Sequence, residues 1–250
     1  MAENAEEIRS SFSRQVGLFT GDDSPFASRG ANVAWVEPLD DDMVVLEVAC
    51  GAAHVAQDLA PHVRALVGID LTSELLAMGR DRLRDAGITN VVLQLGDAGA
   101  LPFVDDSFDL VCCRASLHHF ADPGRAVDEM VRVCRAGGRI AVSDLVVPVA
   151  ELHDAFDDTH RLLDPSHRRS YTDAELVAAF PPSVDVATTS TRATRMPLQS
   201  VLTDVADRAG LDARLQAELD GGAPTGLAPA RDDGALTVEF ATCVLQATKR

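Results

Sequence analysis

Positive charge is scarce in this 250-residue sequence: 22 lysines and arginines stand against 39 aspartates and glutamates, which gives a formal net charge of −17. A protein that binds nucleic acid needs a basic face to neutralise phosphates, and attraction to an anionic membrane surface has the same requirement. The composition therefore predicts a protein that binds neither. The acidity itself predicts solubility.

The sequence also lacks an apolar run long enough to span a bilayer, so no membrane insertion is predicted. Its N-terminus is polar and acidic and has no apolar segment of the kind found in signal peptides. The five cysteines form no C-x-x-C pair, and most of them lie in apolar runs. We therefore expect buried free thiols and a cytoplasmic protein.

What the sequence does contain is a regular alternation of short apolar runs with helical segments. The expected strands cover residues 44–48, 65–69, 91–95, 108–113 and 139–143, and the helices between them cover 54–60, 73–86 and 123–134. Right-handed crossovers between such strands produce an open, parallel, doubly wound sheet. Further along, the expected helices cover 149–163, 172–180, 198–210 and 211–219, and the expected strands cover 184–194 and 236–248.

The stretch 44–70 combines a strand, a turn of small residues, a helix and a second strand that ends in Asp70. Such a unit binds the adenosine part of a cofactor. Glycine or alanine in the turn, as at Gly51, lets the backbone approach a ligand closely. A carboxylate at the tip of the second strand can accept hydrogen bonds from both ribose hydroxyls.

Polar residues follow the ends of several predicted strands, although they are scattered in the sequence. Ligands of doubly wound sheets bind beyond the carboxyl ends of the strands. We therefore expect these side chains to converge on one rim of the sheet: Asp70, Asp97, Arg114, His118 and Asp144.

An amphipathic segment precedes the first strand. Phe12, Val16 and Phe19 are spaced four and three apart, so a helix would place them on one face. The segment 1–38 can act as a helical lid over the cofactor, or it can simply pack on the sheet.

Four motifs occur in order between residues 40 and 150: V-L-E-V-A-C-G-A-A, G-I-D-L, G-D-A-G-A-L-P-F-V-D-D-S-F-D-L-V and R-V-C-R-A-G-G-R-I-A-V-S-D. They resemble the successive motifs of class I S-adenosylmethionine-dependent methyltransferases, and most closely the small-molecule branch with the ubiquinone and menaquinone methyltransferases. The resemblance implies an α/β, Rossmann-like, doubly wound sheet of seven strands. That sheet would be mostly parallel, with an antiparallel last strand and helices on both faces.

The resemblance also implies S-adenosylmethionine as the cofactor and a division of the chain into a lid (1–38), a cofactor-binding core (39–148) and a remainder of the same domain that covers the substrate and supplies the last strands (149–250). The cofactor-binding positions that it implies are Glu47, Ala49 and Gly51 beside the methionine part, Asp70 on the ribose, Leu71 and Asp97 on the adenine, Ala98 facing the ring by its amide, and Arg114 beside the sulfonium. The predicted substrate positions are Phe19, His160, His167 and Tyr171.

The sequence departs from the family in its glycine-rich loop. Ala49 and Ala53 stand where two glycines of G-x-G-x-G are usual, and each adds a methyl group. This motivates a second hypothesis, an S-adenosylmethionine-binding protein of the same fold that does not transfer methyl. A nicotinamide oxidoreductase is disfavoured because the loop lacks G-x-G-x-x-G and Asp97 would have no role. Quinone is not predicted as the acceptor, because Cys134 and Ala136 replace a usual lysine and proline.

Methyl transfer is an in-line displacement at carbon, so the enzyme mainly positions donor and acceptor and excludes water. A base helps when the acceptor is a hydroxyl. His118 and His119 are the candidate catalytic residues, because neutral imidazole can deprotonate or orient an acceptor. The same pair can instead pack the loop or donate to a carbonyl.

A further group of polar residues has the spacing of a metal site. His153, Asp157 and His160 are spaced to share one helical face, which can bind a divalent metal. A polar stripe facing the substrate is the favoured interpretation, so no metal is predicted. The expected partner is a small-molecule acceptor at oxygen, carbon or nitrogen, and the expected assembly is a monomer or homodimer.

Overall fold

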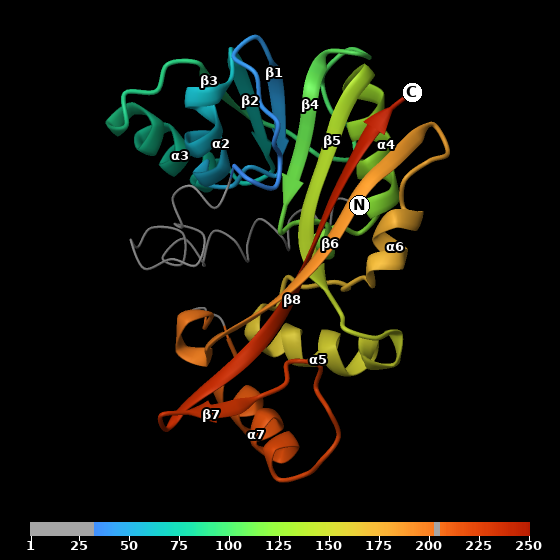
Figure 1. Ribbon diagram of the computed structural model, residues 1–250. Coiled ribbons are helices and arrows are strands. Elements are labelled where there is room, and N and C mark those ends of the chain that lie inside the picture. The colour runs from blue at the N-terminus through green and yellow to red at the C-terminus, as the bar shows by residue number, and fades with distance from the viewer. Residues whose placement is uncertain (1–32, 203–205) are drawn as a thin grey trace.

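The computed structural model describes residues 33–202 and 206–250 (Figure 1). Its centre is one sheet in the order β3-β2-β1-β4-β5-β8-β6, and a short β7 pairs with β8. The strands are β1 Val44–Val48, β2 Ala65–Asp70, β3 Val91–Leu95, β4 Phe108–Arg114, β5 Cys134–Val146, β6 Val184–Pro197, β7 Ala230–Asp232 and β8 Ala235–Lys249. The α-helices are α2 His54–Leu59, α3 Ser73–Asp85, α4 Pro123–Val133, α5 His153–Leu163, α6 Asp173–Ala178 and α7 Arg208–Leu219.

The pairing confirms the predicted fold class. β1 to β5 are mutually parallel where they pair, and β8 is antiparallel to both β5 and β6. The described sheet has eight strands rather than seven, because β7 forms a three-residue hairpin arm on β8. The helix predicted from residue 123 begins there, with Asp122 as its N-cap. The helix predicted from residue 172 begins one residue later, because Thr172 is the N-cap and forms a capping box with Glu175.

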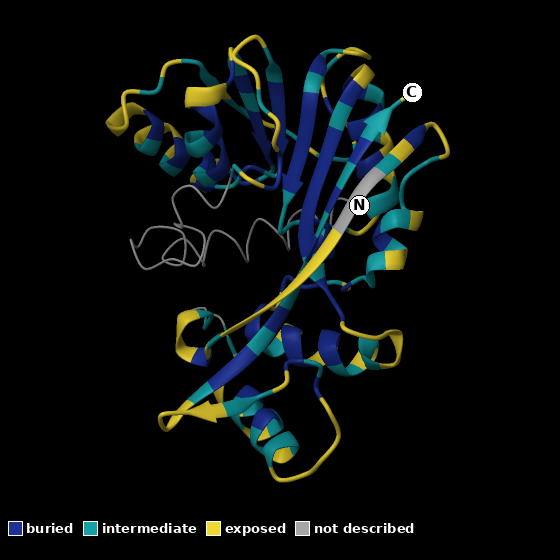
Figure 2. Cartoon of the chain, in the orientation of Figure 1, coloured by how far each residue is buried: buried dark blue, intermediate teal, exposed yellow. Residues whose placement is uncertain are grey.

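Neighbouring residues on the central strands pack on opposite faces, as the two-residue period of a strand requires. Val45 and Cys112 pack with α2 and α3, whereas Leu46 and Cys113 pack with α4. Figure 2 shows β1, β4 and β5 buried along most of their length. All five cysteines are buried and free, which confirms the prediction made for them.

A third apolar core lies away from the parallel half of the sheet. The long strands β6 and β8 run beyond β5 into the lower part of the molecule, where α5, α7 and β7 gather (Figure 1). Phe156 of α5, Leu211 of α7 and Val238 of β8 are fully buried there. α5, α7 and β7 therefore lie below the parallel strands, whereas the end of β8 pairs alongside β5 (Figure 1).

One local prediction is wrong. Helices over 198–210 and 211–219 are expected from the sequence to meet at Gly210, but a short 3-10 helix covers Leu198–Ser200 and α7 runs unbroken from Arg208. The side chain of Asp207 accepts a hydrogen bond from the Gly210 amide, so Gly210 lies in the first turn of α7.

The lid hypothesis falls almost entirely outside the described residues. Phe19 and the rest of segment 1–32 are among those not described, and residues 33–36 form a turn. Within the described residues, no helix combines the length and apolar character needed to cross a membrane.

Candidate active site

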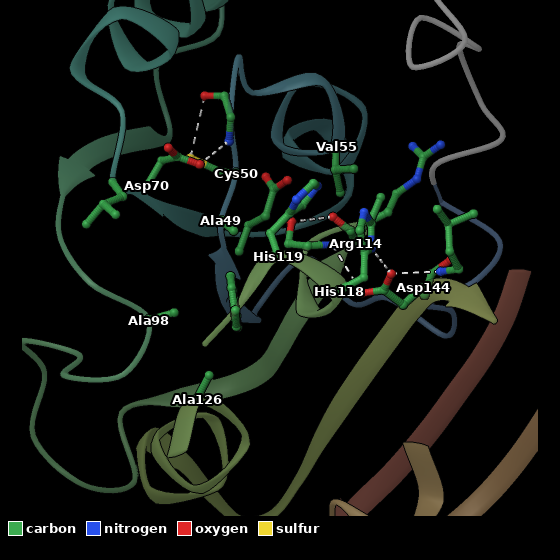
Figure 3. A pocket seen from close by; sticks show the side chains of 18 of the residues that line it. Ala49, Cys50, Val55, Asp70, Ala98, Arg114, His118, His119, Ala126 and Asp144 are labelled. Carbon is green, nitrogen blue, oxygen red and sulfur yellow. Dashed lines mark hydrogen bonds and ion pairs between the residues drawn. The ribbon is translucent and has the colours of Figure 1, made fainter. Parts of the chain in front are cut away.

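A cavity of about 560 Å³ opens at the carboxyl ends of the parallel strands. The residues predicted for the rim converge on it, as the topology requires. The predicted site residues that line it are Glu47, Ala49, Gly51, Asp70, Leu71, Asp97, Ala98, Arg114, His118, His119 and His160. Asp70 and Ala98 lie at one end, and Arg114, His118 and Asp144 lie toward the other (Figure 3).

The loop after β1 has the positive φ angles typical of glycine at three positions, although two of these residues are alanine. Ala49, Gly51 and Ala53 have φ of 56°, 52° and 60°, which is the left-handed region that side chains disfavour. The Cys50 amide donates to the Ile69 carbonyl at 3.0 Å, and this bond ties the loop to β2. Ala49 lines the cavity, whereas Ala53 is fully buried in the core against α2 and α3. Only one of the two added methyl groups therefore belongs to a cavity-lining residue.

Glu47 is a buried carboxyl group at the cavity wall. Its Oε2 atom has no hydrogen-bond partner. Burial raises the pKa of Glu47 to about 8, although the Ala56 amide and the Arg114 charge oppose the shift. An unpartnered carboxylate oxygen in such a place fits a cationic ligand group, and the ammonium of the methionine part of S-adenosylmethionine is one.

Asp70 lies at the tip of β2 with both carboxylate oxygens anchored. Oδ2 accepts from the Gly51 amide at 2.8 Å, and Oδ1 accepts from the Thr72 amide at 2.8 Å. The Thr72 side chain and the Leu71 amide also hydrogen-bond to this carboxylate, so the acceptor expected for the ribose is fixed in position at the strand end. Asp97 is fixed similarly, because its Oδ1 accepts from the Gly99 amide at 2.8 Å. This end of the cavity fits an adenosine.

His118 and Asp144 form a buried pair at the other end. His118 Nδ1 lies 2.5 Å from Asp144 Oδ1, and Asp144 Oδ2 accepts from the Leu117 amide at 2.6 Å. Burial alone lowers the pKa of His118, but the Asp144 carboxylate outweighs it and the net shift is upward. The ring is therefore held in one orientation, with Nε2 as its second nitrogen.

His119 is placed differently from its neighbour. Its Nδ1 lies 3.1 Å from Ser166 Oγ and 3.2 Å from the Ser166 carbonyl oxygen. Burial, and then the charge of His118, lower the pKa of His119 to about 3. It is a weak base and packs the segment around Ser166 onto the rim.

The predicted substrate residues that the structure describes do not all line the cavity. His160 lines the cavity, and His167 is buried behind it, with Nε2 bonded to Asp157 Oδ1 at 2.7 Å. Tyr171 lies outside the main cavity, in a smaller pocket where the Arg169 guanidinium is 5.7 Å from its ring centre. His153 does not share a site with Asp157 and His160, because its Nε2 lies 2.9 Å from Glu175 Oε2.

Several lining residues have no role in the sequence-based prediction. They are Trp35, Leu163, Val201, Phe240, Thr242 and Val244, whereas Met196 is expected from the sequence to line an apolar pocket. Most come from β6, β8 and the segments next to them, whose pairing partners cannot be read from a single strand. Trp35 is the only tryptophan of the chain and stands just before β1, which was a usable signal.

Residues 46–142 match the protein family described as a methyltransferase domain. The matched stretch runs from β1 into β5 and contains the Asp70 end of the cavity. Relatives of this domain include the uncharacterized methyltransferase YcgJ of Bacillus subtilis, which is 39% identical over 137 residues, or 54% of each protein. The ubiquinone/menaquinone C-methyltransferase UbiE of Idiomarina loihiensis is 35% identical over 120 residues, covering 46% of this chain and 48% of that one. The chain thus spans about half the length of these curated relatives.

Solved structures confirm the class I methyltransferase fold over most of the chain. The crystal structure of YcgJ superposes with a TM-score of 0.77 and 26% identity, covering 85% of this chain and 94% of that one. The structure titled as the [4+2]-cyclase SpnF gives a TM-score of 0.72 over 98% of this chain and 96% of that one. At 18% identity, this second likeness shows the fold alone.

Proposed function

We propose that the protein is an S-adenosylmethionine-dependent methyltransferase that acts on a small, partly hydrophobic molecule by in-line methyl transfer. One observation carries the proposal: a single cavity joins an adenosine-type end around Asp70, an unpartnered buried Glu47 oxygen and an end with buried histidines. The methyltransferase family uses this cofactor, and the residues present fit it.

The acceptor occupies the histidine end. The walls there are largely apolar, with Leu163, Met196 and Phe240 among the residues that line the cavity. An apolar wall binds an apolar acceptor and keeps water from the reacting atoms. The small size of the cavity and the acidic surface of the protein agree with a small molecule rather than a nucleic acid.

Of the two predicted catalytic residues, His118 acts on the acceptor. Its ring is oriented by Asp144, lines the cavity and keeps Nε2 for a ligand. His119 has a positioning role instead, because Ser166 holds its Nδ1 and its pKa is low. Among the substrate residues, His160 faces the acceptor directly, and His167 acts from behind it.

A second candidate function has one observation in its favour. The strained alanines of the cofactor loop, Ala49 and Ala53, are compatible with a protein that holds S-adenosylmethionine without transferring its methyl group. The fold does not decide between the two, since SpnF shares it and is described as a cyclase.

Calorimetry with S-adenosylmethionine, S-adenosylhomocysteine and NAD, followed by a turnover assay, separates these two functions from each other and from a nicotinamide oxidoreductase. We expect both sulfur compounds to bind and NAD not to bind. Absence of binding for both sulfur compounds would overturn the proposal. Binding without turnover across a broad panel of phenols, carboxylic acids and amines would favour the second candidate. The monomeric or homodimeric state and the cytoplasmic location stay predictions.

A further inference from the structure

Three histidine rings from separate segments meet behind the cavity. His118 comes from the short 3-10 helix Leu117–His119, His160 from α5, and His167 from the loop that follows α5. One ring nitrogen of each lies within 4.8 Å of the others, and all three side chains are buried. The ring centres of His160 and His167 are 4.3 Å apart, and that of His118 is 5.5 Å from His167.

Two ring nitrogens of this histidine cluster have no hydrogen-bond partner. His160 Nδ1 and His167 Nδ1 are buried and make no hydrogen bond. Buried polar atoms in native proteins are almost always paired, so two such atoms side by side call for a ligand. A bound cation that accepts nitrogen lone pairs is the ligand that satisfies both at once.

Carboxylates stand behind two of the three rings. Asp144 holds Nδ1 of His118 at 2.5 Å, and Asp157 holds Nε2 of His167 at 2.7 Å. In each ring the opposite nitrogen is the one left for a ligand. Metal-binding histidines characteristically donate their second ring N–H to a carboxylate in this way, which fixes the ring and raises its basicity.

The local charge also fits a cation. Asp144, Asp157 and Asp164 all act electrostatically on His118. Zinc–nitrogen bonds are about 2.0–2.1 Å long, so the three rings would close slightly around an ion.

We propose that His118, His160 and His167 bind one divalent transition-metal ion, with zinc as the best match. Three histidines with a fourth position open to water or substrate form a catalytic type of zinc site. Because His118 and His160 also line the cavity, the ion would border the acceptor. His118 then acts on the acceptor through the metal.

The consequence for the substrate class rests on the proposed function. An acceptor hydroxyl that coordinates the ion loses its proton to solvent water more easily. The resulting oxyanion attacks the methyl carbon, the new O–C bond forms as the C–S bond breaks, and the electron pair of that bond returns to sulfur. The products are a methyl ether and neutral S-adenosylhomocysteine. The site therefore favours hydroxylated acceptors.

The test uses the full-length protein after removal of metals with a chelator. Zinc affinity is measured by competition with a chromophoric chelator, and cobalt(II) is added separately because its visible absorption reports tetrahedral coordination. We expect one zinc per chain. His160→Gln and His167→Gln should each weaken binding at least tenfold, and Asp157→Asn should weaken it about 10–100-fold. His62→Ala is the matched control, because His62 is exposed and lies outside the cluster.

S-adenosylhomocysteine binding and far-ultraviolet circular dichroism show whether each variant is folded. The metal proposal is overturned if the folded wild-type protein binds the nucleoside but no zinc, or if both histidine variants bind zinc as tightly as the His62→Ala control. Zinc binding without nucleoside binding would instead overturn the proposed function and leave the metal site standing. The two proposals therefore fail separately.

Discussion

Asp144 of β5 joins two parts of the rim through its two carboxylate oxygens. Oδ1 lies 2.5 Å from His118 Nδ1, while Oδ2 accepts from the Leu117 amide at 2.6 Å. The same group therefore orients the histidine ring and fixes the backbone that carries it. The side chains of His118 and Asp144 are both buried, so water does not compete for the contact between them.

Replacing Asp144 with asparagine should separate these two roles. An amide can still accept from the Leu117 amide, but it no longer supplies charge to His118. We expect methyl transfer to fall at least tenfold while S-adenosylhomocysteine affinity changes less than threefold. Steady-state kinetics and calorimetry measure the two. Asp185→Asn, which alters an exposed pair with Arg250, is the control and should leave both unchanged.

Glu47→Gln should change stability in a pH-dependent way. The folded pKa of Glu47 is about 8, above the ordinary value of 4.5, so the folded state holds a proton that the unfolded state has lost. The stability of the wild-type protein therefore falls as pH rises from about 4.5 to 8. Glutamine does not titrate. The variant should gain on the order of a few kcal/mol over wild type across this window, since each pKa unit is worth about 1.4 kcal/mol.

Urea denaturation at pH 5, 7 and 9 measures this difference, and an equal gap at all three values would contradict it. The same variant should bind S-adenosylmethionine about 10–100-fold more weakly, because it loses a charge-assisted hydrogen bond to the ligand ammonium. Higher stability with weaker binding would be the mark of a carboxyl group kept for a ligand.

Ala49→Gly should stabilise the protein. A left-handed alanine is strained by about 1–2 kcal/mol, and glycine removes that strain at an entropic cost of about 0.5–1 kcal/mol. We expect a net gain of roughly 0–1.5 kcal/mol. Ala53→Gly should gain less, because it also removes a fully buried methyl group.

Ala52→Gly is the matched control for these loop variants. Ala52 lies between the two positions and is not among the residues with positive φ. Ala52→Gly should lose stability in urea denaturation, since glycine there has its entropic cost and removes a buried methyl group without relieving strain. A loss in Ala49→Gly as large as in Ala52→Gly would show that Ala49 carries no strain.

Trp35 gives a direct optical test of cofactor binding. It is the only tryptophan of the chain and lines the cavity. Titration with S-adenosylhomocysteine should therefore change the intrinsic fluorescence in a saturable way, with a midpoint that agrees with calorimetry. Trp35→Phe should lose the optical signal and retain binding by calorimetry within about threefold. A flat titration of a protein that binds by calorimetry would place the ligand elsewhere.

The parallel half of the fold and the adenosine end of the site were predictable because their signals are local. Each buried strand is a short apolar run, and right-handed crossovers then determine where Asp70 and Asp97 must lie. The resemblance to methyltransferase motifs supplied the identity of the cofactor, which strand spacing alone does not contain.

The acceptor end was not predictable to the same extent. Phe240 reaches the cavity only because β8 is inserted between β5 and β6, and the register of such long-range pairs has no local signal. The histidine cluster was not predicted, for a similar reason. Helical spacing grouped His160 with His153, but His153 turns to Glu175, and the partner from the rim is His118.

The position of β8 at the cavity also affects how acceptor preference can change between related proteins. Phe240, Thr242 and Val244 line the cavity, while the intervening Cys243 and the following Leu245 pack in the core on the opposite face. On the cavity face Phe240 also belongs to the third core and Val244 packs against the core beside α2, whereas Thr242 belongs to neither. Thr242 is therefore the β8 position where a substitution can alter substrate preference with the least effect on the packing of the sheet.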